Sequence, residues 1–349
     1  MSSISSQKIL HVVNDNLTAQ AIAHTELPGE ILPWQDTLYE GPVNYFDDLD
    51  SLAIDRAKYF TAQGYGDYKT IEQAYLSRNA ILKDYNNYQQ IILWFDHDLY
   101  GQLQLIQLIE WLGRQETGSI EISHIDLTRL KQQRTRRRRI SQLLPAEIQT
   151  LFRSTIEVTQ QQIEICTQAW YAYTNGNPEY IVQFKPPDIS SMPFLKDTFI
   201  RLAREFPYKT TGLSQTELLI IDAVKHKNFT EDDIFSYVQN KEPVAFMSKI
   251  VFQRILQRLM DAQFPVLKLQ VIEQEVVLEV DDSTDMSSER EIVKDSRILT
   301  TNYTNQVLNK WVDWIQLNSI NRWIGGVHLN EGNLWRYDPV SRQINKTYV

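Results

Sequence analysis

The sequence contains a single cysteine, Cys166, among 349 residues, so no disulfide can form within the chain. Cys166 lies in an apolar stretch, where a thiol is more typical of core packing than of a nucleophile. No apolar run approaches the ~18 residues of a membrane span. Residues 1–7 are polar and lack the basic and apolar regions of a signal peptide. These absences predict a cytoplasmic protein with no membrane partner.

The sequence also lacks the short motifs of several enzyme classes. It contains no G-x-G-x-x-G, no G-x-x-x-x-G-K-[ST], no H-E-x-x-H and no G-x-S-x-G. Dinucleotide-binding, P-loop, zincin and α/β-hydrolase assignments therefore have no motif to rest on. Composition is close to that of an average globular protein and identifies no reaction.

Positive charge is in deficit, since 35 Lys and Arg against 44 Asp and Glu give a net charge of −9. This balance argues against a wholly basic nucleic-acid binder, but a local basic surface remains compatible with it. The length is sufficient for two or three domains, each with its own core.

Residues 1–128 alternate short β-branched runs with helical patterns. Strands are expected at 8–13, 29–34, 90–95 and 120–125, and helices at 18–24, 47–63, 71–85 and 99–112. This alternation predicts a Rossmann-like α/β domain with a mainly parallel sheet.

Two further parts are expected after the α/β domain. Residues 129–211 carry a basic run followed by helical segments, which predicts an all-helical bridge. Residues 212–349 predict a winged-helix-like α+β domain. Its expected elements are helices at 215–226, 231–238 and 246–260, a hairpin of the β-rich runs 266–270 and 275–280, an acidic, Ser-rich loop at 281–289, a helix at 305–317 and a hairpin across 323–337.

Polar and acidic residues follow three of the expected strands. In a parallel sheet these strand ends meet at one edge, where ligands bind. Carboxylates gathered there can hold a divalent cation or raise the pKa of one carboxyl for acid–base work. The candidate catalytic residues are Asp36, Glu40, His97 and Asp98, and the candidate ligand-binding residues are Asn14, Asp15, Gly41 and Asp96.

A second interpretation of these residues is structural. Asp and Asn are also the preferred N-cap residues of helices, and Asp15 and Asp98 both precede an expected helix. His97 fits an ordinary loop histidine as well as a base or metal ligand.

Two basic features point to nucleic acid as a partner. Residues 129–139 (RLKQQRTRRRR) contain no acidic residue, and the expected helix at 246–260 can place basic side chains on one face. The candidate nucleic-acid-binding residues are Arg136, Arg137, Arg138, Arg139, Lys249, Arg254 and Arg258. The alternatives are a solvated surface paired with the chain's own acids, and a winged helix that binds protein.

Several longer runs resemble known bacterial sequences. The N-terminal runs are HVVNDNLTA (11–19), LPGEILPWQDTLYEGPV (27–43) and LWFDHDLYGQLQLIQLIEWL (93–112); the C-terminal runs are GLSQTE (212–217), AFMSK (245–249), LNSINRWIGGVHL (317–329) and LWRYD (334–338). They resemble domain-of-unknown-function family 1835 joined to domain-of-unknown-function family 3658. The resemblance implies a two-part architecture and no activity. One departure stands out, because the family pattern N-G-D-[ST] is replaced here by Asn14-Asp15-Asn16-Leu17.

Taken together, the residues predict binding of a nucleotide or a nucleic-acid-related ligand at the acidic strand ends, with metal-dependent hydrolysis or phosphoryl transfer as the reaction they would allow. A non-enzymatic DNA- or RNA-binding regulator and a protein interaction scaffold are the alternatives.

Overall fold

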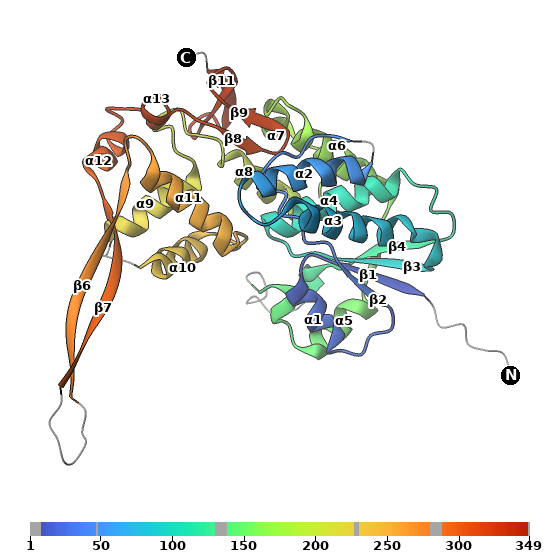
Figure 1. The fold of residues 1–349 in the computed structure, drawn as a ribbon. Helices are drawn as coiled ribbons and strands as arrows, with labels where there is room; N and C mark the ends of the chain where they lie inside the picture. Colours follow the sequence, from blue (N-terminus) through green and yellow to red (C-terminus); the bar gives the residue numbers. More distant parts are fainter. Residues whose placement is uncertain (1–7, 47, 130–137, 227–229, 280–287, 348–349) are drawn as a thin grey trace, which may run out of the picture. The chain divides into compact units, whose positions relative to one another are not determined.

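The computed structural model describes residues 8–46, 48–129, 138–226, 230–279 and 288–347, with the backbone alone at 272–279 and 288–295. The chain divides into two compact units (Figure 1). Unit 1 comprises residues 1–206, 243–246 and 320–349, and unit 2 comprises residues 207–242 and 247–319. This division differs from the three expected domains, because the expected bridge and the last strands of the chain belong to the same unit as the sheet.

Unit 1 is built on a five-stranded sheet in the order β2-β1-β3-β4-β5. The strands are β1 (Ile9–Val13), β2 (Glu30–Pro33), β3 (Gln90–Trp94), β4 (Glu121–His124) and β5 (Ile156–Glu157). The first four pair in parallel and β5 pairs antiparallel to β4. The predicted α/β class with a mainly parallel sheet is confirmed. The expectation of an all-helical bridge is wrong at β5, whose two residues are too few to show a period in the sequence.

Helices cover both faces of the sheet in unit 1. In Figure 1, α1 (Asn16–Ala23) and α5 (Pro145–Arg153) lie on one face, and α2 (Leu49–Ala62), α3 (Tyr68–Lys83) and α4 (Leu99–Gly113) lie on the other. Alternate β1 side chains point to opposite faces, and Ile9 and Val13 pack in one core with Ile22 of α1 and Ile148 of α5. Further elements are η1 (Tyr85–Asn87), η2 (Leu127–Arg129), η4 (Ile140–Gln142), α6 (Gln160–Thr174), α7 (Glu179–Gln183) and α8 (Leu195–Ala203).

The last strands of the chain complete unit 1. They form two antiparallel hairpins, β8 (Arg322–Ile324) with β9 (Val327–Leu329) and β10 (Leu334–Asp338) with β11 (Gln343–Thr347). The N–H of Val43 donates to the carbonyl oxygen of Gly325 over 2.9 Å, and Arg322 forms an ion pair with Glu205 at 2.6 Å. The sequence predicted one hairpin here, whereas the structure has two.

Unit 2 contains three helices followed by a long antiparallel pair of strands. Its elements are α9 (Gln215–His226), α10 (Glu231–Lys241), α11 (Lys249–Asp261), β6 (Leu267–Glu279), β7 (Ser288–Thr300), α12 (Asn302–Leu308) and α13 (Trp314–Asn318). The expected helix at 305–317 is divided where Lys310 takes a positive φ of 62°.

The expected hairpin of the runs 266–270 and 275–280 is wrong. Residues 267–270 and 275–279 belong to the single strand β6, which pairs with β7. Four residues lie between the runs: Val271 and Ile272 favour a strand, and Glu273 and Gln274 are not turn formers, so the strand continues through them. The expected loop falls largely on residues 280–287, which lie outside the described residues.

Two predictions from the sequence, one on membrane spans and one on Cys166, can be compared with the structure. No helix in the described ranges combines the length and the apolar character needed to cross a membrane. Cys166 is fully buried, and burial raises the pKa of its thiol and disfavours the reactive thiolate. Its predicted role as a core residue is confirmed.

Candidate functional site

The ends of β1 and β3 bring four of the predicted residues together. These are Asn14, Asp15, Asp96 and Asp98, which with Arg139 we call the strand-edge cluster. The two strands are neighbours in the sheet, and the order 2-1-3-4-5 reverses direction between them. Such a reversal makes the loops above β1 and β3 diverge, which is where open α/β sheets bind ligands.

Asp96 is held through both of its carboxyl oxygens. The N–H of Ile140 donates to Oδ1 over 2.8 Å, and Nδ2 of Asn14 donates to Oδ2 over 3.2 Å. The residue is only 1% exposed, and burial together with the nearby Asp98 raises the pKa of Asp96 to about 8. A carboxyl in this state can take up or release a proton near neutral pH.

Asp98 is the N-cap of α4, because its Oδ1 accepts a hydrogen bond from the N–H of Gly101 over 2.7 Å. Its Oδ2 lies 3.4 Å from Nη2 of Arg139, which also donates to the carbonyl oxygen of Ala245. Burial raises the pKa of Asp98 although Arg139 opposes the shift. Asp98 is therefore both the cap of α4, through Oδ1, and the ion-pair partner of Arg139, through Oδ2. Its interpretation as an N-cap explains only the first of these two oxygens.

Asn14 and Asp15 are fixed by the start of α1. Asp15 caps this helix by accepting the N–H of Thr18 over 2.8 Å, and the Thr18 hydroxyl donates to Oδ1 of Asn14. The hydroxyl of Tyr100 donates to the carbonyl oxygen of Asn14 over 2.9 Å. Burial, followed by the charge of Asp15, raises the pKa of Tyr100 well above its usual range, so Tyr100 remains a neutral donor.

His97 is positioned beside the cluster and is 8% exposed. Its ring packs against Phe194 with the ring centroids 5.3 Å apart. The His97 charge also favours the ionised form of Asp98. His97 is therefore a buried loop histidine whose charge acts on the Asp98 carboxyl. Its role as a base stays a prediction.

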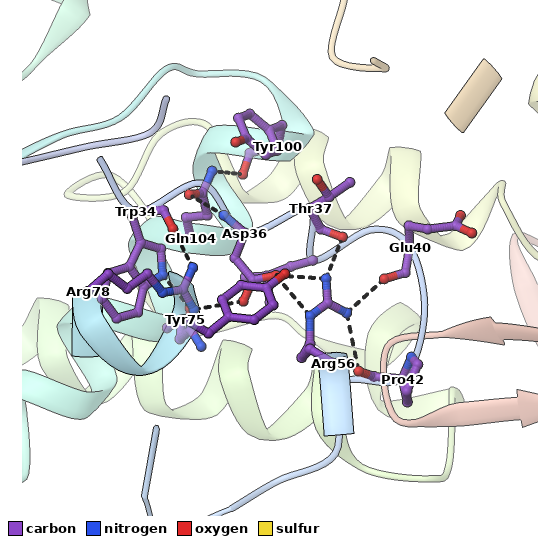
Figure 2. Close-up of polar contacts among 12 residues, drawn as sticks. Trp34, Asp36, Thr37, Glu40, Pro42, Arg56, Tyr75, Arg78, Tyr100 and Gln104 are labelled. Atoms are coloured by element: carbon purple, nitrogen blue, oxygen red, sulfur yellow. Dashed lines mark hydrogen bonds and ion pairs between the residues drawn. The ribbon is translucent and has the colours of Figure 1, made fainter. Parts of the chain in front are cut away.

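Asp36 lies in a second cluster, centred on two arginines (Figure 2). Its Oδ1 is 2.7 Å from Nη2 of Arg56, and its Oδ2 accepts from Arg78 over 3.1 Å. All three side chains are buried. Burial alone would raise the pKa of Asp36, but the two arginines hold it below its usual value. Asp36 is thus a permanently ionised partner for two cations, and no contact in this cluster favours its predicted catalytic role.

Arg56 fixes the loop that carries Asp36, Glu40 and Gly41. Its guanidinium donates to the carbonyl oxygens of Thr37, Glu40 and Pro42 over 2.8, 2.7 and 3.2 Å (Figure 2). The Glu40 carboxylate accepts from the Tyr59 hydroxyl at 2.9 Å. Gly41 has φ of 79°, and a Cβ there would lie 2.5 Å from the Tyr59 ring. These contacts explain Glu40 and Gly41 as parts of a rigid loop; their predicted roles in a site stay untested.

Most of the predicted nucleic-acid-binding residues that can be described have acidic neighbours. Arg138 makes a bidentate ion pair with Glu147 at 3.0 and 2.9 Å, Lys249 pairs with Asp232, and Arg258 pairs with Glu217 at 2.6 Å. Arg254 projects from α11, and its Nε atom is buried. Arg136 and Arg137 lie outside the described residues. These ion pairs match the alternative prediction, in which the basic side chains pair with acidic residues of the same chain.

A metal site has no ligand set in the part of the chain that the structure describes. No three His, Cys, Asp or Glu side chains are grouped there so that they could hold a metal ion. The cation suggested by the acidic strand ends therefore stays a prediction without support from these residues.

Three contributors to the two clusters were absent from the predicted site: Arg56, Arg78 and Tyr100. A signal for Arg56 exists in the sequence, because it lies four residues from both Leu52 and Phe60 on the buried stripe of α2. An arginine on an apolar stripe requires a buried acceptor. Arg139 was predicted as a nucleic-acid contact, and its neighbour is instead Asp98.

Comparison with known proteins adds no relative. A scan against protein-family models gives no match, and neither does a search of the curated proteins. The resemblance to families 1835 and 3658 therefore stays a prediction.

Proposed function

We propose that unit 1 binds a nucleotide or a nucleic-acid-related ligand at the strand-edge cluster and that Asp96 exchanges a proton with it. The observation that supports this is the position of two buried aspartates, Asp96 and Asp98, where the order of the parallel strands reverses. Doubly wound, Rossmann-like sheets with this order bind nucleotides at that point. The ligand class is inferred from this similarity of fold alone. The proton-transfer role is inferred from the burial of Asp96 and its raised pKa.

The proposed chemistry uses the unusual state of Asp96. An ordinary aspartate is ionised at neutral pH and has no proton to give, whereas a carboxyl with a pKa of about 8 is mostly protonated there and can donate a proton. In a hydrolysis or a phosphoryl transfer, such a group would give its proton to the leaving-group oxygen, and the carboxylate so formed would take up the proton released by the attacking water or hydroxyl.

Thermal unfolding of the full chain tests the proposal. A ligand that binds only the native state raises Tm, by the equivalent of about 2.7 kcal/mol at a concentration of 100 Kd. We expect at least one of ATP, GTP, CTP, UTP and NAD to raise Tm, with or without Mg²⁺. Asp96→Asn should retain binding while abolishing any turnover. The proposal fails if none of these compounds shifts Tm at millimolar concentration.

A second candidate function is nucleic-acid binding by unit 2. The order of α9, α10, α11 and the strands β6 and β7 is that of a winged helix-turn-helix module, in which α11 would be the recognition helix. The ion pairs of Lys249 and Arg258 work against this role, because nucleic acid would have to displace Asp232 and Glu217.

Binding of random duplex DNA and RNA at several salt concentrations tests this second candidate. Affinity should fall steeply with salt, and the double variant Arg254→Ala, Arg258→Ala should weaken it. Equal binding by the parent and the double variant would remove the candidate and favour a protein interaction scaffold.

A further inference from the structure

The two carboxyl oxygens of Asp98 are in different situations. Oδ1 accepts the N–H of Gly101, as expected of an N-cap. Oδ2 is buried and accepts no hydrogen bond, although Nη2 of Arg139 lies 3.4 Å away. The residue as a whole is 2% exposed. The ion pair compensates part of the cost of burying this oxygen, but its hydrogen-bonding capacity stays unused, which native proteins seldom allow.

Helix capping does not require this arrangement, as the other capping aspartates of unit 1 show. In Asp15, Oδ1 accepts from Thr18 and Oδ2 accepts from Asn14. In Asp48, Oδ1 accepts two backbone N–H groups and Oδ2 accepts the Ser51 hydroxyl. Asp67 caps α3 and is exposed to water. Asp98 differs from all of them, because its second oxygen is buried at the strand edge, accepts no hydrogen bond and has only the 3.4 Å ion pair with Arg139.

We propose that Oδ2 of Asp98 accepts a hydrogen bond from an uncharged O–H or N–H group of the ligand, so that the strand-edge cluster holds the nucleoside part of a nucleotide. This inference rests on the proposed function and specifies which end of the ligand occupies the site. Two sources provide such a donor, a ribose hydroxyl and an amino group on the base.

Charge excludes the phosphate end from this position. Asp98 lies beside Asp15 and the protonated Asp96, and the described residues whose positive charge acts on Asp98 are Arg139 and His97. A phosphate beside the carboxylates of Asp15 and Asp98 would bring like charges together where water is scarce and the Coulomb energy is large. A hydroxyl or amino group brings no charge and supplies the donor that Oδ2 lacks. Carboxylates bind ribose hydroxyls in this way in other doubly wound folds.

Isothermal titration calorimetry on the full chain tests the inference. The probes are adenosine, guanosine, cytidine and uridine, the corresponding 5′-monophosphates, and inorganic phosphate. We expect at least one nucleoside to bind within about tenfold of its monophosphate and inorganic phosphate not to bind. Asp98→Asn keeps the cap and should weaken nucleoside binding about ten- to hundredfold, as expected for the loss of a hydrogen bond to a charged group. Asp67→Asn, which changes a capping aspartate away from the cluster, should bind as the parent does.

Analogues identify the donor without any variant, which keeps the test valid if Asp98→Asn does not fold. A 2′,3′-dideoxynucleoside lacks the 2′- and 3′-hydroxyls, which are the ribose hydroxyls that a 5′-monophosphate also retains, and purine riboside lacks the amino group of adenosine. A loss of about tenfold or more with one of them assigns the donor, whereas unchanged binding of both overturns the inference.

The remaining outcomes separate the inference from the proposed function. If monophosphates bind while nucleosides do not and inorganic phosphate competes, the inference is wrong and the proposed function stands. If Asp98→Asn folds and binds nucleoside as tightly as the parent, the inference is also wrong. If neither nucleosides nor nucleotides bind, the proposed function itself is wrong and the inference falls with it.

Discussion

The backbone N–H of Ile140 donates a hydrogen bond to Oδ1 of Asp96 over 2.8 Å, although 44 positions separate the two residues in the chain. Asn14 occupies the other oxygen. With both oxygens held, Asp96 cannot turn toward water to relieve the cost of burying its charge. Protonation is the response open to it, and the stability of the protein should therefore depend on pH.

The first prediction concerns the slope of that dependence. Because the pKa of Asp96 is raised to about 8 in the native state, the native state binds a proton that the unfolded state has released. The free energy of unfolding should then decrease as pH rises from about 4 to 8, by at most about 1.4 kcal/mol per pH unit for one proton, and this contribution should be lost above that range. Urea denaturation should show that Asp96→Asn lacks this part of the slope. Equal slopes in the parent and the variant would contradict the prediction.

The second prediction concerns His11, which is fully buried on β1. Trp94 donates to its Nδ1 over 3.0 Å, and its Nε2 contacts the carbonyl oxygen of Pro28, so the ring is neutral with the proton on Nε2. Burial lowers the pKa of His11. The native state thus resists protonation, and its stability should be lost as pH falls below about 6.5.

NMR titration of the imidazole resonance of His11 measures this effect directly. The His11 midpoint should lie below 6.5. A midpoint at or above that value would show that the buried ring accepts a proton without penalty.

The third prediction concerns Arg56. Arg56→Ala removes a cation from a fully buried ion pair and leaves three carbonyl oxygens without their donor. We expect a loss of about 3–5 kcal/mol in the free energy of unfolding. Lys58→Ala, two residues away at a 64% exposed side chain, is the matched control and should change stability by less than about 0.5 kcal/mol. A loss below about 1 kcal/mol for Arg56→Ala would show that the loop does not depend on this guanidinium.

The fourth prediction concerns the contact between α4 and the end of β3. A Cβ at Gly101 would lie 2.4 Å from the carbonyl oxygen and 2.7 Å from the nitrogen of Asp96, both of them backbone atoms that cannot rotate away. Gly101→Ala should therefore lower stability by about 1–3 kcal/mol or more. Gly176→Ala, whose added Cβ has its nearest neighbour at 3.9 Å, should be almost neutral. Thermal unfolding of the two variants makes the comparison, and equal Tm values would contradict it.

The sequence predicted the sheet edge better than it predicted the partners of the edge residues. Strand ends can be read from runs such as QIILWF because β-branched and apolar residues stop abruptly before Asp96. Parallel pairing then brings Asn14 and Asp96 to the same edge. Period and composition do not specify which cation meets which acid, because side-chain pairing depends on distances set by the whole fold. Arg139 illustrates this, since it lies in a basic run but its carboxylate partner is on another loop.

Three features of the chain's strands differ from the sequence prediction: β5, β6 and the placement of β8 to β11. The strand β5 is two residues long and carries no period, and the strand β6 was divided because its apolar residues fall into two groups. The membership of β8 to β11 in unit 1 could not be predicted, because a local pattern does not say which earlier segment a late hairpin will pack against.

The return of residues 320–349 to unit 1 has a consequence for the order in which the protein can be made. A ribosome delivers the sheet first, then unit 2, and only at the end Arg322, the ion-pair partner of Glu205. Until that moment the nascent sheet lacks the hairpin whose Gly325 accepts the N–H of Val43. Unit 2 can therefore finish folding before unit 1, and unit 1 reaches its final structure only after translation has passed residue 325.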